Sequence, residues 1–93
     1  MISLVMPTHI NSERLLELTK NAVTSFGEVE LIVVDDASPL GGGYLRSIAD
    51  IYIRNIENLG YGKSVNRGMK LATSNYIAIA NNDIRISPNW QEV

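Results

Sequence analysis

Cysteine is missing from this sequence of 93 residues. Disulfide bonds, thiolate metal sites and thiol catalysis are therefore excluded. An excess of basic residues is missing too: eight Lys and Arg face ten Asp and Glu, which leaves a formal net charge of −2. A protein that binds nucleic acid usually presents a basic face, so this balance gives no support for a nucleic-acid partner.

Long hydrophobic runs are missing as well. No stretch of the sequence approaches the ~20 consecutive apolar residues that a membrane-spanning helix needs. Residues 1–6 have neither the basic start nor the apolar length of a signal peptide. We therefore expect a cytoplasmic protein with no transmembrane segment.

The remaining composition is that of a globular domain. Hydrophobic residues make up 45% of the chain and charged residues 19%, which argues against disorder. A chain of this length can form one domain and buries roughly 60–65% of its unfolded surface. We expect residues 1–93 to form a single domain with one modest core.

Four short apolar runs predict the strands of a buried sheet. Residues 2–6 form the first, which should end at Pro7 because proline cannot donate to a ladder. Residues 31–34 are β-branched and uninterrupted, as in a doubly covered parallel sheet. Residues 51–54 are more mixed, as edge strands often are, and residues 76–80 carry no charge and predict a strand buried on both faces.

Helical periodicity lies between these runs. The first predicted helix is capped by Asn11 or Ser12 and stops at Gly27. The three glycines 41–43 should stay outside any regular helix, and residues 44–49 predict a short helix after them.

A further helix is predicted at residues 63–73, with Val65, Met69 and Ala72 on one face. Residues 87–90 resemble another helix start, with a capping serine followed by proline. The element order β-α-β-(α)-β-α-β predicts an α/β fold with a parallel sheet and helices on both of its faces.

Polar side chains follow three of the predicted strands, at the sheet edge where open α/β folds bind their ligands. They are Thr8 and His9 after the first strand, Asp35, Asp36 and Ser38 after the second, and Asn81, Asn82 and Asp83 after the fourth. Two of these sets of residues are acidic and neither includes a basic residue. This combination favours a cation or a hydrogen-bond donor as the partner. Carboxylate and amide oxygens suit a hard divalent ion such as Mg²⁺.

Simpler structural explanations compete with this interpretation. Asn81, Asn82 and Asp83 can form an ordinary turn after a strand, because Asn and Asp tolerate the left-handed conformation. His9 is the sole histidine, and a general base would need an orienting partner that the sequence does not reveal.

The segment before the last complete helix offers a possible anion site. Gly60 and Gly62 precede the helix start, where backbone N–H groups can meet an anion, although a plain loop-to-helix entry explains them equally well. Lys63 can contact a phosphate or simply be solvated. Tyr61 and Trp90 are predicted to be packing residues, with stacking on a base or sugar as the alternative.

Four motifs then occur in an order that resembles the inverting glycosyltransferases of family 2, which have the GT-A fold, and especially their rhamnosyltransferase-like members. The motifs are Met6-Pro7-Thr8, Ile32-Val33-Val34-Asp35-Asp36-Ala37-Ser38, Asn58-Leu59-Gly60-Tyr61-Gly62 through Asn66-Arg67-Gly68, and Asn81-Asn82-Asp83 with its trailing Pro88-Asn89-Trp90. The resemblance covers nearly the whole chain. It implies the parallel-sheet, nucleotide-binding half of a GT-A (Rossmann-like) fold with sheet order 3-2-1-4.

The resemblance also implies roles for individual residues. Asp36 would accept a hydrogen bond from the base of a nucleotide-diphosphate sugar, and Asp83, with Asn81 close by, would ligate Mg²⁺ or Mn²⁺ that bridges the diphosphate. The reaction implied is in-line displacement at the anomeric carbon with inversion. The other residues implied in donor binding are Pro7, Thr8, His9, Asp35, Gly60, Lys63, Asn66 and Asn82.

Some features depart from the family pattern. His9 stands where the family usually has Tyr, and Asn81 replaces an Asp, which predicts weaker metal affinity. No residue can be assigned as the catalytic base, and neither the donor sugar nor the acceptor, a sugar or polysaccharide, can be named. We therefore expect a donor-binding portion of a glycosyltransferase that is either truncated at its C-terminal end or works with another polypeptide.

Two other functions stay open at this point: a non-catalytic nucleotide- or metal-binding module, and a plain α/β domain whose acidic loops are only turns. The implied sheet order leaves the strand from Tyr76 to Ala80 at an uncovered edge. An apolar edge invites pairing with another chain, so we predict a homo-oligomer formed through this strand.

Overall fold

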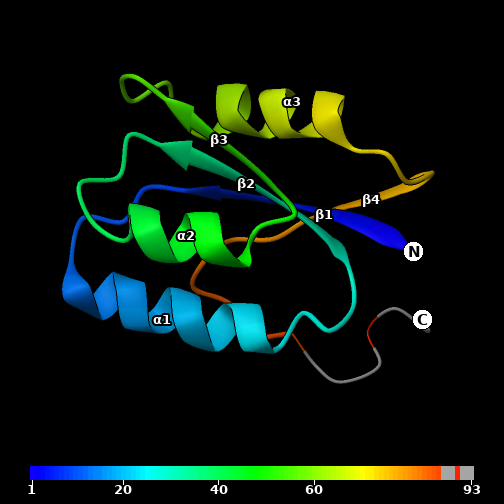
Figure 1. Cartoon of the computed structure of the whole chain (residues 1–93), viewed down its shortest axis with the longest axis horizontal. Coiled ribbons are helices and arrows are strands. Elements are labelled where there is room, and N and C mark those ends of the chain that lie inside the picture. Colours follow the sequence, from blue (N-terminus) through cyan, green and yellow to red (C-terminus); the bar gives the residue numbers. More distant parts are fainter. Residues whose placement is uncertain (87–89, 91–93) are drawn as a thin grey trace.

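The computed structural model of the chain describes residues 1–86 and residue 90. A four-stranded parallel sheet with the strand order β3-β2-β1-β4 crosses its centre (Figure 1). The strands are β1 (Ile2–Thr8), β2 (Glu30–Asp36), β3 (Ile51–Asn55) and β4 (Tyr76–Ile79). The predicted α/β class, the parallel sheet and the order 3-2-1-4 are confirmed.

Helices cover both faces of this sheet. Figure 1 shows α1 (Glu13–Thr24) and α2 (Gly42–Ile48) on one face and α3 (Tyr61–Leu71) on the other. Ser12 caps α1, because its Oγ accepts a hydrogen bond from Leu15 N at 3.1 Å. The helix ends at Thr24, earlier than the predicted stop at Gly27.

The core is split between the two faces because side chains alternate along each strand. The larger cluster lies between the sheet and α1 and α2, and its members include Leu4, Met6, Phe26, Leu31 and Val33. The smaller cluster, of Val5, Ile32 and Val34, lies on the opposite face.

Gly68 lets α3 pack directly on the smaller cluster. A Cβ atom at this position would lie 2.4 Å from Val5 Cγ1, closer than a Cβ can approach, and 3.0 Å from Val34 Cγ2, which is a tight contact. The predicted apolar face of α3 is only partly buried, since Met69 is exposed and the buried residues are Ser64, Val65 and Gly68. The helix also begins at Tyr61, two residues before the predicted start.

Both central strands run further than predicted. β1 continues through Pro7, which pairs in register with Val34. Ala80 N donates to Val5 O, so the backbone N–H and C=O of Val5 point toward β4. Backbone groups two residues apart on a strand point the same way, so those of Pro7 also point toward the β4 side. β4 ends at Ile79, so the N–H that Pro7 lacks has no strand opposite it.

The prediction that glycines 41–43 lie outside any helix was wrong for Gly42 and Gly43 and right for Gly41. Gly42 and Gly43 form the first turn of α2, and Gly41 precedes them with a positive φ of 80°. A left-handed residue at this point turns the chain into the helix, and glycine adopts that conformation without strain.

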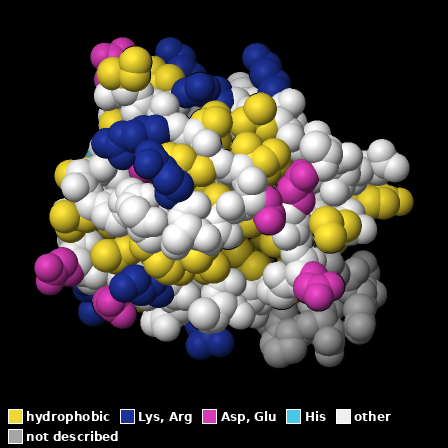
Figure 2. Space-filling model, in the orientation of Figure 1, with side chains coloured by type: hydrophobic (Ala, Val, Ile, Leu, Met, Phe, Trp, Pro, Cys, Tyr) yellow, Lys and Arg dark blue, Asp and Glu magenta, His cyan; other side chains and the backbone are white. Residues whose placement is uncertain are grey.

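β4 is an edge strand, as expected, but it is not buried on both faces. Ile77 and Ile79 are 42% and 45% exposed. In register they lie beside Ser3 and Val5, on the face that α3 covers. The helix packs over β1 and β2, so it leaves this side of β4 open, and hydrophobic side chains lie exposed at the end of the molecule where β4 begins (Figure 2).

The helix start predicted at Ser87, Pro88 and Asn89 lies outside the described residues. Trp90 is a packing residue, as predicted: it contacts the larger cluster, and its Nε1 donates to Phe26 O at 3.0 Å. Among the described helices, none has the length and apolar character needed to cross a membrane.

Candidate functional site

A pocket of about 300 Å³ lies at the C-terminal edge of the sheet. Three loops that follow strands meet the beginning of α3 there. The lining residues are Pro7, Thr8, His9, Asp36, Asn58, Gly60, Tyr61, Ser64, Asn81 and Asn82. Seven of them were predicted as site residues from the sequence, so the expectation that separate loops converge on one rim is confirmed.

Thr8 lines this pocket and carries a buried hydroxyl. The residue ends β1, is only 3% exposed and lines the cavity. Among the buried side-chain nitrogen and oxygen atoms of residues 1–86 and 90, one has no hydrogen-bond partner, and it is the Oγ1 of Thr8. Leaving such a group unpaired costs about 1–3 kcal/mol, which makes this oxygen a natural contact point for a polar ligand.

Asp36 holds the loop that forms the opposite wall. Its Oδ1 accepts hydrogen bonds from Asn55 Nδ2 at 2.8 Å and from Leu59 N at 2.7 Å, and its Oδ2 accepts one from Gly60 N at 2.9 Å. Burial raises the pKa of this carboxyl, but these hydrogen bonds and the nearby His9 outweigh burial and hold its pKa below the usual value. The ionised carboxylate therefore accepts three hydrogen bonds from the protein itself. Its Oδ2 accepts only one of them and can still accept a bond from a ligand.

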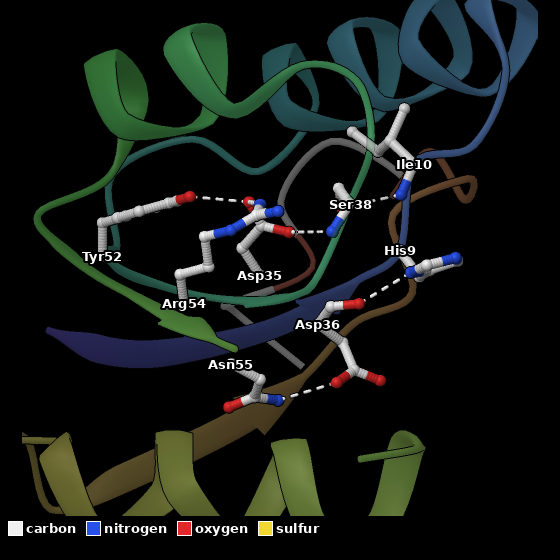
Figure 3. Close-up of polar contacts among 8 residues, drawn as sticks. All are labelled: His9, Ile10, Asp35, Asp36, Ser38, Tyr52, Arg54 and Asn55. Atoms are coloured by element: carbon white, nitrogen blue, oxygen red, sulfur yellow. Dashed lines mark hydrogen bonds and ion pairs between the residues drawn. The ribbon is translucent and has the colours of Figure 1, made fainter. Parts of the chain in front are cut away.

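Asp35 points to the other side of the sheet (Figure 3). Its Oδ2 accepts from Tyr52 OH at 2.6 Å and from Arg54 Nη1 at 2.9 Å, and its Oδ1 accepts from Ser38 N at 2.9 Å. It is fully buried and is not among the residues that line the pocket. Adjacent residues of a strand face opposite sides, so the sequence prediction that Asp35 joins Asp36 at the ligand is not supported by its placement.

The Asp35 side chain organises the first loop indirectly. Ser38, which Asp35 holds by its backbone N–H, accepts a hydrogen bond at its Oγ from Ile10 N at 2.8 Å. Burial and the hydrogen bond to Asp35 raise the pKa of Tyr52, so this phenol stays a donor. The loop after β1 is thereby tied to the loop after β2.

His9 has the orienting partner that the sequence could not reveal. Its Nδ1 donates to the Asp36 carbonyl oxygen at 2.6 Å, because a carbonyl can only accept (Figure 3). In the neutral ring this leaves Nε2 as an acceptor. The imidazole thus lines the pocket in a fixed tautomer.

The N-terminal end of α3 forms another part of the wall. Gly60 precedes the helix with a φ of 91°, and Gly60, Tyr61 and Ser64 all line the pocket. Tyr61 is 58% exposed and lines the pocket, so its prediction as a packing residue was wrong. Lys63 and Asn66 are exposed on α3 and do not line the cavity. Lys and Arg side chains lie among other surface on the upper part of the molecule, around β3 and α3 (Figure 2).

The loop after β4 closes the remaining side. Asn81 and Asn82 line the pocket, and Asn82 Nδ2 donates to Thr19 Oγ1 at 2.9 Å, which ties this loop to α1. Asp83 is exposed and does not itself line the cavity, although its Cα lies only ~3.8 Å from that of Asn82. In the described part of the chain no three His, Asp or Glu side chains gather in a way that could hold a metal ion.

Sequence reasoning missed two buried residues that support the site. Ser64 lines the pocket from the first turns of α3, and Asn55 ends β3 directly opposite Asp36 in register. A polar residue at the C-terminal end of an apolar strand is a signal that could have found Asn55, since the same signal found Asp36. Ser64 had no comparable signal because its role depends on which face α3 turns inward.

Comparisons with known proteins agree with this architecture. The fold is similar to that in the crystal structure of S. aureus TarS, with a TM-score of 0.75 and 20% sequence identity. The similarity covers 98% of this chain but only 18% of TarS, so the chain spans less than a fifth of that protein's length. The sheet and its helices are those of the nucleotide-binding half of the GT-A (Rossmann-like) fold. Residues 3–93 match the family model described as Glycosyl transferase family 2, so the chain belongs to this family.

Proposed function

We propose that this chain binds the nucleoside diphosphate portion of a nucleotide-sugar donor for glycosyl transfer. The observation that supports this most is Thr8, which lines the pocket and whose hydroxyl is buried without a protein partner. A fold with no ligand to bind would satisfy such a group internally or replace it by an apolar one. A nucleotide supplies both donors and acceptors that can pair with it.

The shape and polarity of the pocket suit this ligand. Its volume of about 300 Å³ falls in the range of small-molecule sites. The rings of His9 and Tyr61 provide flat surfaces on which a base can stack. The α3 N-terminus adds backbone N–H groups and a positive dipole end for phosphate oxygens.

The polar groups beside the pocket also fit a divalent cation. Asn81 offers an amide oxygen at the cavity and Asp83 an exposed carboxylate just beyond it. Mg²⁺ and Mn²⁺ are commonly held by one or two protein oxygens, with ligand phosphates and water completing the shell. When bound, such an ion would stabilise the negative charge of the departing diphosphate.

The reaction that we propose is inverting transfer: an acceptor hydroxyl attacks the anomeric carbon and forms the new glycosidic bond as the bond to the diphosphate breaks. The residues described here bind the donor and hold its diphosphate. The catalytic base and the acceptor site stay unassigned. The alternative is a module that binds a nucleotide and metal without turnover, which the same pocket would also explain.

A calorimetric panel tests this function. We expect uridine, deoxythymidine or guanosine diphosphate to bind, with higher affinity when Mn²⁺ is present. Asp83→Asn should abolish the Mn²⁺ enhancement, while Asp50→Asn, a matched change at an aspartate far from the pocket, should preserve it. The Asp50 carboxylate accepts a hydrogen bond from Leu31 N, which an amide oxygen can also accept.

The panel has two informative failures. If none of the diphosphates binds, donor binding is wrong. If binding occurs but Asp83→Asn changes nothing, the metal role of Asp83 is wrong. Release of a sugar or its transfer from a bound donor would separate an enzyme from the non-catalytic alternative.

A further inference from the structure

Asn55 lies behind the pocket and connects three of the elements that form it. It is 1% exposed and is not among the lining residues. Its Nδ2 donates to Asp36 Oδ1 at 2.8 Å and to Ser64 Oγ at 3.0 Å, and its Oδ1 accepts from Arg67 Nη1. One buried amide therefore joins the ends of β2 and β3 to α3.

The neighbours of Asn55 permit only one orientation of this amide. A flip would place Oδ1 against the Asp36 carboxylate and Nδ2 against the Arg67 guanidinium, which are two repulsive contacts in place of two attractive ones. Both N–H donors are used in the observed orientation. The amide is thus a fixed donor aimed at Asp36 (Figure 3).

The orientation of Asp36 in turn sets the pocket wall. The same Oδ1 that accepts from Asn55 accepts from Leu59 N, and Oδ2 accepts from Gly60 N. Gly60 lines the cavity with a left-handed φ of 91° and leads directly into Tyr61. A rotated carboxylate would release both N–H groups and with them the segment that places the Tyr61 ring.

We propose that Asn55 is a positioning residue for the pocket: it locks the Asp36 carboxylate in the orientation that holds the Leu59–Gly60 wall in its ligand-ready form. Its effect on ligand binding rests on the nucleotide-binding function proposed above. Its effect on the wall does not, so the two can be tested separately.

The first test uses the chain without nucleotide. Amide hydrogen exchange at Leu59 and Gly60, measured by NMR relative to Val33 in the central strand, reports local opening of the wall. Asn55→Ala should speed exchange at Leu59 and Gly60 by roughly tenfold relative to Val33, since a hydrogen bond to a charged group is lost. Ser3→Ala, which removes a buried hydroxyl at the far end of the sheet, should leave this relative rate unchanged.

The second test uses pH to switch the interaction. In Asn55→Asp the new carboxyl group faces the Asp36 carboxylate from β2 and the Arg67 guanidinium from α3, with His9 on the far side of Asp36. Two adjacent carboxylates share a proton that is held at raised pH. Protonation recreates an O–H donor toward Asp36, so lowering the pH should restore the lost contact.

The readout is the ratio of variant to wild-type dissociation constants for the diphosphate that binds best, with Mn²⁺, from pH 8 to pH 5.5. Taking the ratio removes the titration of the phosphate. We expect Asn55→Asp to bind roughly tenfold more weakly at pH 8 and to approach wild type at pH 5.5, while the Asn55→Ala ratio stays constant.

The outcomes separate the two proposals. Unchanged relative exchange at Leu59 and Gly60 in Asn55→Ala overturns the positioning role, whether or not a nucleotide binds. A pH-independent ratio for Asn55→Asp also overturns it, because a merely structural defect would not be repaired by a proton. If the wild type binds no diphosphate while the exchange result holds, donor binding fails and the positioning role stands.

Discussion

Replacing Thr8 by valine should make the protein more stable and its ligand binding weaker. Valine keeps the shape of threonine and exchanges the hydroxyl for a methyl group. The Thr8 Oγ1 is buried without a partner in the described structure, so its removal relieves a desolvation cost that the folded state otherwise carries. Stability and function are therefore expected to change in opposite directions at this position.

The size of each effect follows from the contacts. Burying an unpaired hydroxyl costs about 1–3 kcal/mol in proteins, so Thr8→Val should raise the free energy of unfolding by about 1 kcal/mol. In a domain of this size that raises Tm by roughly 4–8 °C. Loss of one ligand hydrogen bond, worth about 0.5–1.5 kcal/mol, should weaken nucleotide binding by roughly three- to tenfold.

Urea unfolding and calorimetric binding, done on the same samples, measure the two effects. Thr8→Ser is the matched control: it keeps the hydroxyl and removes the methyl group, so it should lose stability while binding nearly as well as the wild type. Thr8→Val that is less stable and binds normally would refute the reasoning, because the hydroxyl would then have a partner within the fold and no role toward a ligand.

Three further predictions concern the framework. Gly68→Ala should lower the free energy of unfolding by about 1–3 kcal/mol, since its Cβ would meet Val5. Gly62 lies on the same helix, and a Cβ there would meet no atom within 4 Å apart from its chain neighbours and its own helix backbone. Gly62→Ala should therefore show no loss in the same urea experiment, and equal losses would contradict this packing argument. Hydrogen bonds from Ser3 and Thr73 lower the pKa of Glu30 below 4.5, so its stabilising effect is present above pH 4.5 and is lost as the pH falls through the lowered value. The difference in stability between wild type and Glu30→Gln should accordingly shrink in acid, and a constant difference would refute it. Through the open β4 edge we expect self-association in analytical ultracentrifugation that Ile77→Lys suppresses, and a wild type that stays monomeric at high concentration would rule it out.

The fold could be predicted from the sequence because its signals are local. Short apolar runs separated by helical periodicity define a parallel α/β sheet, and polar residues that follow the runs mark the binding edge. The ends of elements were less predictable, since Pro7 fits in β1 only because β4 has already ended beside it. Likewise, Ile77 and Ile79 are exposed because α3 packs over β1 and β2. The position of that helix cannot be predicted from a local sequence pattern.

The site was predictable as a set of loops but less so as a set of contacts. Thr8 ends β1, His9 directly follows it, and Asp36 ends β2, so all three reach the pocket at this edge of the sheet. Tyr61 was misassigned because its exposure follows from α3 beginning two residues early. The position of Asn55 at the end of an apolar run was a usable signal, but its partners Asp36, Ser64 and Arg67 are brought together only by the tertiary structure.

The two adjacent aspartates explain how an acidic motif can serve an anionic ligand. Strand alternation sends Asp35 to one face, where it anchors the loop of Ser38, and Asp36 to the other, where it anchors Gly60. Each carboxylate is surrounded by donors of the protein, so its charge is largely compensated before any ligand arrives. If the chain binds a diphosphate as proposed, the groups left to meet it would be Thr8, the start of α3, His9 and Tyr61. Repulsion between an acidic motif and a phosphate is thereby reduced, and a divalent ion beside Asn81 would lower it further.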